Sequence, residues 1–523
     1  MRLNQFSIRV VLRKDQIKYD FLIGGIIFLS GLIGITTNTF NLKLAKKYES
    51  SNNPMTVSGV TILSPDNIYY LSPVENYLAG KGWRQSPSVG NGSYFRRTPG
   101  YPLLYYAFRR GLSFEKTLWA LRTFQFILFL VSTYCVFYIF RFLNISLSSS
   151  VVLTLIYGCT PFFSSYTYFT LTESISPFLV IFSLFFLLKP PAETKSRRLH
   201  YQLSSFFLGY AIMTRPILGL LIPGILLYVF FQSKSSSFLN RTLTASSIMI
   251  IPFCLIGVWA IRNYAVTKEF VALEMADHPE SLDRMKPEFG AFWNFTKCWA
   301  EDGSRMNSYH IPFYQSALAG DTSSAHIKKI IDHIPSEVKD ELSEVAIRST
   351  IKDYQHIIYL EKPYFDSVRP LPRQYSPDEM RVAAEFDLLT TKWVRRHYFK
   401  YYVLNPLKYV LDIVVHSNTS NLMIFQKPYR DNWLIMDVLR LSLAAIHIGL
   451  YFLLFVNLFT FSGATKNYVL FVLIPVTFII FFVFYLQAIE QRYMLPVLPL
   501  ILIGAGFPLD DYLKKLRVVN SFK

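Results

Sequence analysis

The chain has 523 residues, of which 52% are hydrophobic, 17% aromatic and 17% charged, and its mean hydropathy is +0.28. Soluble proteins carry about a quarter charged residues, so this composition excludes an ordinary soluble domain and predicts a membrane protein. The net charge of +18 would suggest nucleic acid on a soluble domain. Here the basic residues lie next to apolar runs, so membrane orientation and anionic lipid headgroups explain the charge, and we expect no nucleic-acid partner.

The first apolar segment, residues 21–37, follows a basic N-terminus, which the positive-inside rule places in the cytoplasm. No small-residue cleavage site follows this segment, so we expect a retained helix rather than a signal peptide. Nine more apolar segments return a basic C-terminus to the cytoplasm. The ten predicted spans are residues 21–37, 118–140, 147–158, 174–188, 203–214, 217–231, 243–261, 434–459, 468–486 and 493–507.

Two long segments, about 38–116 and 263–433, then lie outside the membrane. Helical apolar spacing predicts helices at 335–355 and 376–400, whereas 277–325 reads as irregular. Aromatic and basic residues alternate over 393–415, which predicts amphipathic helices in the membrane interface, broken at Asn405-Pro406. The expected fold is all-α and polytopic, with about ten transmembrane helices, interfacial helices and a mainly α extracytoplasmic segment.

Cysteines and histidines predict no disulfide and no zinc site. Cys298 is alone outside the apolar segments, so we expect no disulfide framework. His310, His326, His333 and His356 lack zinc-ligand spacing, so we expect them on the surface.

Charged residues gather at one membrane face in this threading. An ionisable group beside a spanning helix is costly unless it is paired or hydrated, so such a cluster predicts one polar site at the outer membrane boundary, typical of a membrane enzyme. The cluster comprises Asp66, Arg96, Arg97, Glu173, Arg215, Arg262, Glu490 and Arg492.

Asp66 and the two adjacent arginines each have two interpretations. A carboxylate beside apolar surface can act as a general base, but Asp66 also follows Pro65 where a helix-capping residue would stand. Arg96 and Arg97 precede a rigid Pro-Gly-Tyr-Pro turn. Their guanidinium groups could bind a phosphate of a substrate or anchor the loop to lipid headgroups.

A series of short motifs makes the chain recognisable. Their order, with every motif outside, resembles the GT-C membrane glycosyltransferases, and is most similar to the branch with protein O-mannosyltransferases and the lipid A aminoarabinose transferase. The resemblance covers about residues 60–275 and 390–507. The motifs are Asp66-Asn67-Ile68-Tyr69, Ala79-Gly80-Lys81-Gly82-Trp83, Arg97-Thr98-Pro99-Gly100-Tyr101-Pro102, Leu171-Thr172-Glu173-Ser174, Thr214-Arg215-Pro216, Trp259-Ala260-Ile261-Arg262-Asn263-Tyr264 and Glu490-Gln491-Arg492-Tyr493-Met494-Leu495-Pro496.

The resemblance implies a hexosyl- or pentosyltransferase that moves a sugar from a polyprenyl-phosphate donor to a lipid, glycan or protein acceptor in the cell envelope. Asp66 matches the acid thought to assist deprotonation of the acceptor. The lipid-phosphate leaving group needs a cation. Our first choice for this cation is Arg97, followed by Arg96, Arg215, Arg262 and Arg492. Some relatives pair two acids in the first loop, but here Asn67 follows Asp66. This departure counts against a metal-dependent mechanism; a divalent metal cofactor is left open, and we assign no metal ligand.

Three other site residues keep alternatives open. Glu173 is either a second site carboxylate or a helix-start acid stabilised by the helix dipole. Glu490 and Arg492 either form an internal ion pair or contact the ligand. Arg262 is either an interface anchor or a site residue.

The resemblance also divides the chain into three parts and places it in a bacterial inner (plasma) membrane, with its site facing outside. Residues 1–265 form an N-terminal transmembrane catalytic module that includes the first extracytoplasmic loop, 38–116. Residues 266–432 form an extracytoplasmic segment with interfacial helices, and 433–523 form C-terminal transmembrane helices.

Two rival functions remain. A polytopic secondary transporter also has about ten helices and buried charges, but its site tends to lie near the midplane within inverted repeats. A non-catalytic scaffold would use the outer segment to bind a partner. Charges at one rim, two long outside segments and the absence of an evident repeat favour the enzyme.

Overall fold

The computed structural model describes residues 3–49, 60–62, 66–85, 97–190, 194–233, 237–268, 270–274, 286–299, 303–367, 371–372, 374–426, 434–461, 464–487 and 490–521. These residues are mostly helical, as predicted. The helices of the first half of the chain are α1 (Leu3–Glu49), α2 (Asn67–Leu78), α3 (Gly100–Arg109), α4 (Phe114–Phe142), α5 (Leu147–Cys159), α6 (Pro161–Ser164), η1 (Ser165–Tyr168), η2 (Thr172–Ser174), α7 (Ser176–Leu188), α8 (Thr194–Thr214), η3 (Pro216–Leu220), α9 (Leu221–Gln232), α10 (Phe238–Ser247) and α11 (Ile250–Thr267).

The second half of the chain forms a helical bundle and then returns to apolar helices. This bundle, called the outer bundle below, comprises α12 (Pro287–Trp299), α13 (Gly303–Ala319), α14 (Ser324–His333), α15 (Ser336–Leu342), α16 (Glu344–Leu360), α17 (Lys362–Asp366) and α18 (Pro377–Arg396). After it come η4 (Lys400–Leu404), α19 (Asn405–Val414), η5 (Met423–Phe425), α20 (Leu434–Thr460), α21 (Thr465–Tyr468), η7 (Val469–Leu473), α22 (Ile474–Ile480), η8 (Phe481–Leu486), η9 (Gln491–Met494) and α23 (Leu498–Ser521).

The chain is a multi-pass integral membrane protein. Within the described residues, six helical stretches are long and apolar enough to cross a bilayer. Two shorter apolar stretches, Thr172–Leu188 and Pro216–Gln232, also overlap predicted spans, so the total of ten stays a prediction. The six are Tyr19–Lys47, Phe114–Phe142, Leu147–Tyr168, Ile250–Thr267, Leu434–Thr460 and Thr465–Leu486.

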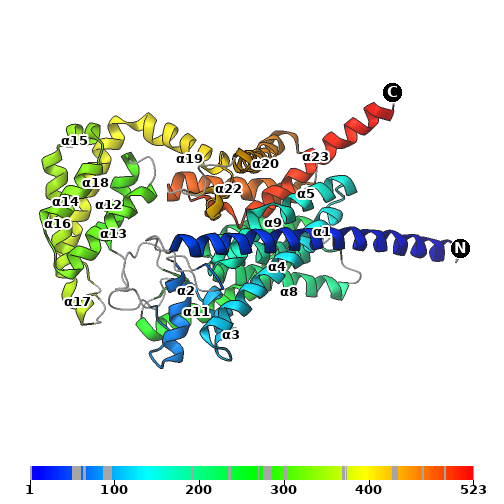
Figure 1. The fold of residues 1–523 in the computed structure, drawn as a ribbon, viewed down its shortest axis with the longest axis horizontal. Helices are drawn as coiled ribbons and strands as arrows, with labels where there is room; N and C mark the ends of the chain where they lie inside the picture. Colours follow the sequence, from blue (N-terminus) through cyan, green and yellow to red (C-terminus); the bar gives the residue numbers. More distant parts are fainter. Residues whose placement is uncertain are drawn as a thin grey trace.

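The two chain ends lie away from the outer bundle. Figure 1 shows the beginning of α1 and the end of α23 on the right, and α12–α18 at the far left. Because α1 runs from right to left in this view, its end at Glu49 approaches the bundle. The bundle therefore projects beyond the end of the membrane helices opposite the chain termini.

Helix α1 is longer than the predicted span, which ended at residue 37. It continues to Glu49 because its polar residues are buried in specific contacts. The Asn38 amide donates to the carbonyl of Ser164 at 2.8 Å, and Asn41 accepts from the amide of Met423 at 2.7 Å. Buried amides with partners can remain in a packed helix, so the polar residues do not end it.

The outer bundle has its own core, which is separate from that of the membrane helices. Residues 335–355 and 376–400 are largely helical, as predicted, and the Ser376 and Glu379 capping box begins α18. The irregular structure expected for 277–325 is wrong over α12 and α13. In α12, Phe292, Phe295 and Trp299 have helical spacing and face α18, so packing against a distant helix stabilises this segment.

Two further expectations for this region need correction. His310, expected on the surface, is buried, and its Nε2 lies 2.9 Å from the Tyr354 hydroxyl; burial lowers the pKa of His310 to about 3. The interfacial helices are not broken at Asn405-Pro406, because a π-helical turn, η4, leads directly into α19, where Pro406 is tolerated in the first turn. The backbone leaves the helix earlier, at His397. The exposed Leu407 and Leu411 of α19 fit a helix in the membrane interface.

All four cysteines are free, as expected, and Cys298 is buried in the bundle core.

Candidate functional site

Charged residues from distant parts of the sequence meet at one small cavity of about 170 Å³. It lies where several elements begin or end: before α2, before α3, around η2, after α8, after α11 and at η9. Its lining comprises Asp66, Tyr70, Arg97, Thr172, Glu173, Thr214, Arg215, Pro216, Ile217, Glu274, Arg492 and Tyr493.

Asp66 is held at the cavity by the contacts that precede and follow it. Just before it, Ile62 forms an isolated parallel bridge with Phe169, and its amide donates to the carbonyl of Tyr168 at 2.9 Å. After it, α2 is tied to α3 by Glu75, which accepts from the Tyr105 hydroxyl at 2.6 Å. The Asp66 side chain makes no capping hydrogen bond to α2. Helix capping therefore does not explain its position.

Arg97 is placed by a close contact between the start of α3 and the end of α8. A Cβ atom on Gly100 would lie only 2.5 Å from the carbonyl oxygen of Met213, so this approach requires glycine. The Tyr210 hydroxyl donates to the carbonyl of Gly100 at 2.8 Å, which fixes the two helix ends together. As a result, Arg97 lies on the same cavity as Arg215, the residue that follows α8.

The Arg97 guanidinium is charged and incompletely satisfied. Burial alone lowers the pKa of Arg97, but Tyr70, Glu274 and Asp66 outweigh it, and the pKa lies above its ordinary value. Its Nε is buried without a hydrogen-bond partner among the described residues. A buried cationic donor with unused hydrogen-bonding capacity is suited to an anionic ligand.

Glu173 is buried between two arginines. Its Oε1 lies 2.8 Å from Nη1 of Arg215 and 3.6 Å from Nε of Arg492, and its Oε2 accepts from the Thr172 hydroxyl at 3.1 Å. It belongs to η2, whose next residue, Ser174, donates to Gln125 at 2.8 Å. The carboxylate therefore faces the cavity arginines.

Gln125 of α4 holds this region together. Its Oε1 also accepts from the Tyr101 hydroxyl at 2.7 Å, and its Nε2 donates to the carbonyl of Thr167 at 2.8 Å. One buried amide thus connects α3, η1 and η2 to a membrane helix. Buried networks of this kind make local geometry rigid when every member is satisfied.

Arg492 connects the carboxylates of the site. It lies 2.9 Å from Oδ2 of Asp66 through Nη2 and 2.5 Å from Oε2 of Glu490 through Nε, in addition to its contact with Glu173. Burial lowers the pKa of Arg492, but these three carboxylates raise it above its ordinary value. The internal Glu490–Arg492 pair is therefore present, and the same guanidinium also reaches the cavity.

Two of the predicted phosphate-binding arginines are not among the described residues that line the cavity. Arg96 lies outside the described residues. Arg262 does not line the cavity; it donates to the carbonyl of Trp83 and to Oδ1 of Asn263, and its guanidinium lies 4.6 Å from the Trp259 ring. These contacts favour an anchoring role for Arg262.

Glu274 is a cavity residue that the motifs did not reveal. Burial raises its pKa, although Arg97 and Arg215 oppose the shift. It stands alone in an apolar run after α11, so no paired acid or arginine in the sequence marked it.

The donor set of the cavity does not fit a divalent metal ion. Arg97, Arg215 and Arg492 line it, and one oxygen of Asp66 and one oxygen of Glu173 already contact guanidinium groups. A divalent cation there would meet three positive charges. The buried Nε of Arg97, which has no partner among the described residues, instead suits an anion.

Comparison with known proteins agrees with the motif order. Residues 99–260 match the family model described as dolichyl-phosphate-mannose-protein mannosyltransferase. No curated protein sequence matches the chain.

Three solved structures are similar at low identity. The apo oligosaccharyltransferase of Archaeoglobus fulgidus has 11% identity and a TM-score of 0.46, with 96% of this chain and 51% of that chain covered. The oligosaccharyltransferase AglB from the same organism, in complex with an inhibitory peptide and a dolichol-phosphate, has 11% identity and a TM-score of 0.45, with 96% and 52% covered. ArnT from Cupriavidus metallidurans in the apo state has 13% identity and a TM-score of 0.32, with 90% and 76% covered.

The chain thus spans about half the length of the two oligosaccharyltransferases. The family match covers the cavity residues Glu173 and Arg215. It agrees with the resemblance that the motifs predicted, because residues 99–260 match the model of a membrane glycosyltransferase family.

Proposed function

We propose that this protein transfers a sugar from a polyprenyl-phosphate donor to a lipid, glycan or protein acceptor at the extracytoplasmic face of a bacterial inner membrane. One observation carries the proposal: three acids and three arginines, remote in sequence, line a single cavity. They are Asp66, Glu173, Glu274, Arg97, Arg215 and Arg492. The description of the matching family names a dolichyl-phosphate-linked sugar, which has the same donor chemistry.

Arg97 is the proposed cation for the leaving phosphate. As the bond between sugar and phosphate breaks, negative charge develops on the phosphate, and a fixed guanidinium stabilises it. Arg215 already forms an ion pair with Glu173, and Arg492 forms one with Asp66. No ion pair joins Arg97 to a described carboxylate. Arg97 can therefore accept phosphate without first losing such a pair. Arg96 and Arg262 stay secondary candidates.

Asp66 is the proposed general base. The acceptor hydroxyl must lose its proton as its oxygen attacks the anomeric carbon, and a positioned carboxylate can accept that proton. Arg492 holds one Asp66 oxygen and also contacts Glu173. We propose that Arg492 orients Asp66, and that Glu173 orients Arg215 and Arg492.

The position of the charges favours an enzyme over a secondary transporter. Arg215 follows the end of α8, Asp66 precedes α2, and Arg492 lies in the turn between η8 and α23. These are ends of elements, whereas transporter sites typically lie on broken helices near the bilayer midplane.

The substitution Asp66→Asn tests the proposal. It keeps the side-chain volume and removes the basic oxygen, so sugar transfer from a purified polyprenyl-phosphate donor is expected to fall by about 10²–10⁴-fold. The exposed bundle residue Asp340 provides a matched control, and Asp340→Asn should retain wild-type turnover. Wild-type turnover by Asp66→Asn would exclude the base assignment. Transport of a polar solute by wild-type vesicles without any glycosylated product would favour the transporter.

A further inference from the structure

We propose that the outer bundle binds a hard divalent cation, of the calcium or manganese class, through Glu288, Glu361 and Glu379. This site lies in the core region of α12–α18 and is distinct from the glycosyl-transfer cavity. The three carboxylates come from three places in the bundle: the first turn of α12, the junction of α16 and α17, and the first turn of α18.

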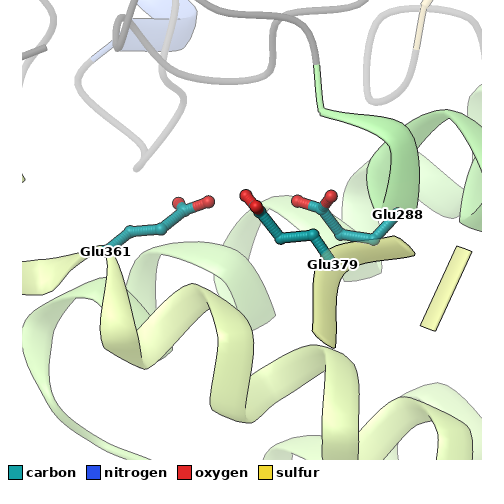
Figure 2. Close-up of side chains that lie close together, drawn as sticks. All are labelled: Glu288, Glu361 and Glu379. Carbon is teal, nitrogen blue, oxygen red and sulfur yellow. The ribbon is translucent and has the colours of Figure 1, made fainter. Parts of the chain in front are cut away.

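The geometry brings one oxygen of each carboxylate to a common point. These three atoms lie within 4.8 Å of one another, a spacing that one ion with bonds of about 2.3–2.6 Å could bridge. Figure 2 shows the three side chains pointing toward one another from separate helices. An arrangement of mutually repelling carboxylates requires compensation by positive charge or protons.

Glu288 is the observation that points to a ligand. Its side chain is fully buried, with 0% of its surface exposed. Both of its oxygens, and Oε1 of Glu361, lack hydrogen-bond partners among the described residues. A buried carboxylate with two unused acceptor oxygens is suited to cation binding.

Lys286 neutralises only part of the cluster. Its ammonium group is buried and bound to Oε2 of Glu361 and to the Tyr314 hydroxyl. The Tyr314 hydroxyl also donates to that same Oε2, at 2.7 Å. Both groups occupy one oxygen of Glu361, so its other oxygen remains directed to the cluster.

Glu379 has a second duty that fixes its position. One of its oxygens accepts from the Ser376 amide at 2.5 Å in the capping box of α18. A carboxylate can accept at both oxygens, so capping and metal coordination are compatible. The all-oxygen donor set selects hard cations rather than zinc, which prefers nitrogen and sulfur ligands. A bound ion would join α12, the α16–α17 junction and α18.

Terbium luminescence of the full-length protein tests the site. Tb³⁺ mimics calcium, and the Tyr314 ring is close enough to Glu361 to sensitise its emission. After chelation and buffer exchange, wild-type protein should give saturable emission that excess Ca²⁺ or Mn²⁺ abolishes. Glu288→Gln and Glu361→Gln should lose this emission, while Asp340→Asn, which removes an exposed carboxylate of the same bundle, should retain it.

Measurements on the wild type keep the test independent of variant folding. We expect chelation to lower the Tm and added Ca²⁺ or Mn²⁺ to restore it, because a ligand that binds only the folded state stabilises it. Absence of saturable Tb³⁺ emission, an unchanged Tm after chelation, or wild-type emission in both glutamine variants would overturn the proposal. A Glu288→Gln protein that is more stable than the wild type and insensitive to metal would instead indicate that Glu288 holds a proton.

Discussion

Single residues at the cavity differ mainly in how completely their charge is already paired. Arg492 contacts Asp66, Glu173 and Glu490, whereas Arg97 has a buried Nε with no partner in the described structure. An arginine committed to three carboxylates orients its neighbours, and one with free donors can take a new anion. This contrast assigns different tasks to two residues of the same type.

Arg97→Ala should therefore impair donor binding selectively. Loss of a charged hydrogen bond costs about 1.5–3 kcal/mol, so the KM for the polyprenyl-phosphate donor should rise by roughly 10–150-fold. The KM for the acceptor should change little. Steady-state kinetics with each substrate varied in turn measures both values. Arg110→Ala, at an exposed arginine beyond α3, should leave both unchanged. An unaltered kcat/KM for the donor in Arg97→Ala would rule out the phosphate contact.

Motif order predicted which residues would meet at the cavity better than it predicted what each would touch. Asp66, Glu173, Arg215 and Arg492 were expected at one face, and all of them line the cavity. Glu274 was missed because a lone acid in an apolar run gives no pattern. Its environment is created by Arg97 and Arg215, which precede it by more than fifty residues in the chain.

At the scale of elements, the junction of α3 and α8 controls the site. Gly100 contacts the backbone of Met213 and Thr214, and Arg97 and Arg215 are each a few residues from this contact. Backbone atoms cannot rotate away as a flexible side chain can. The distance between the two arginines therefore depends on the absence of a side chain at residue 100.

Gly100→Ala should destabilise the protein and reduce activity together. The added Cβ would lie 2.5–2.6 Å from backbone atoms, and overpacking of this kind costs about 1–3 kcal/mol. Thermal unfolding in detergent and the sugar-transfer assay measure the two effects. Gly111→Ala is the matched control, because a Cβ there meets no atom within 4 Å. Equal stability and activity of the two alanine variants would contradict the proposed role of the junction.

Helix boundaries were predicted correctly where hydrophobicity changes along the chain. They were predicted wrongly where tertiary contacts determine where a helix begins or ends. The predicted spans 118–140 and 434–459 match the bounds of α4 and α20 closely because each helix is a long apolar run. The predicted first span ends at residue 37 because Asn38 is polar, although α1 continues to Glu49. Likewise, α12 was missed because its apolar face is stabilised by α18, which lies far along the chain.

At the scale of the whole molecule, the topology has a direct test. The outer bundle and the chain termini lie at opposite ends of the membrane helices (Figure 1). In a background without native cysteines, Ser323→Cys at the start of α14 should react with a membrane-impermeant maleimide in intact cells. Ser237→Cys, before α10, should react only after permeabilisation. Labelling of both positions in intact cells, or protection of Ser323→Cys, would show that the threading is wrong. Ser86, which the sequence also places outside, is not among the described residues.

The existence of two separate hydrophobic cores has a thermodynamic consequence for the whole chain. The bundle core draws its buried residues from one contiguous stretch, Ala291 to Trp393, and shares none with the core of the membrane helices. Two cores without shared members need not unfold cooperatively, so we expect separate thermal transitions, and the Tm that chelation lowers is that of the bundle. The bundle can lose its structure while the apolar helices persist in the bilayer, and a heated sample can therefore retain its membrane helices after losing the domain beside the cavity.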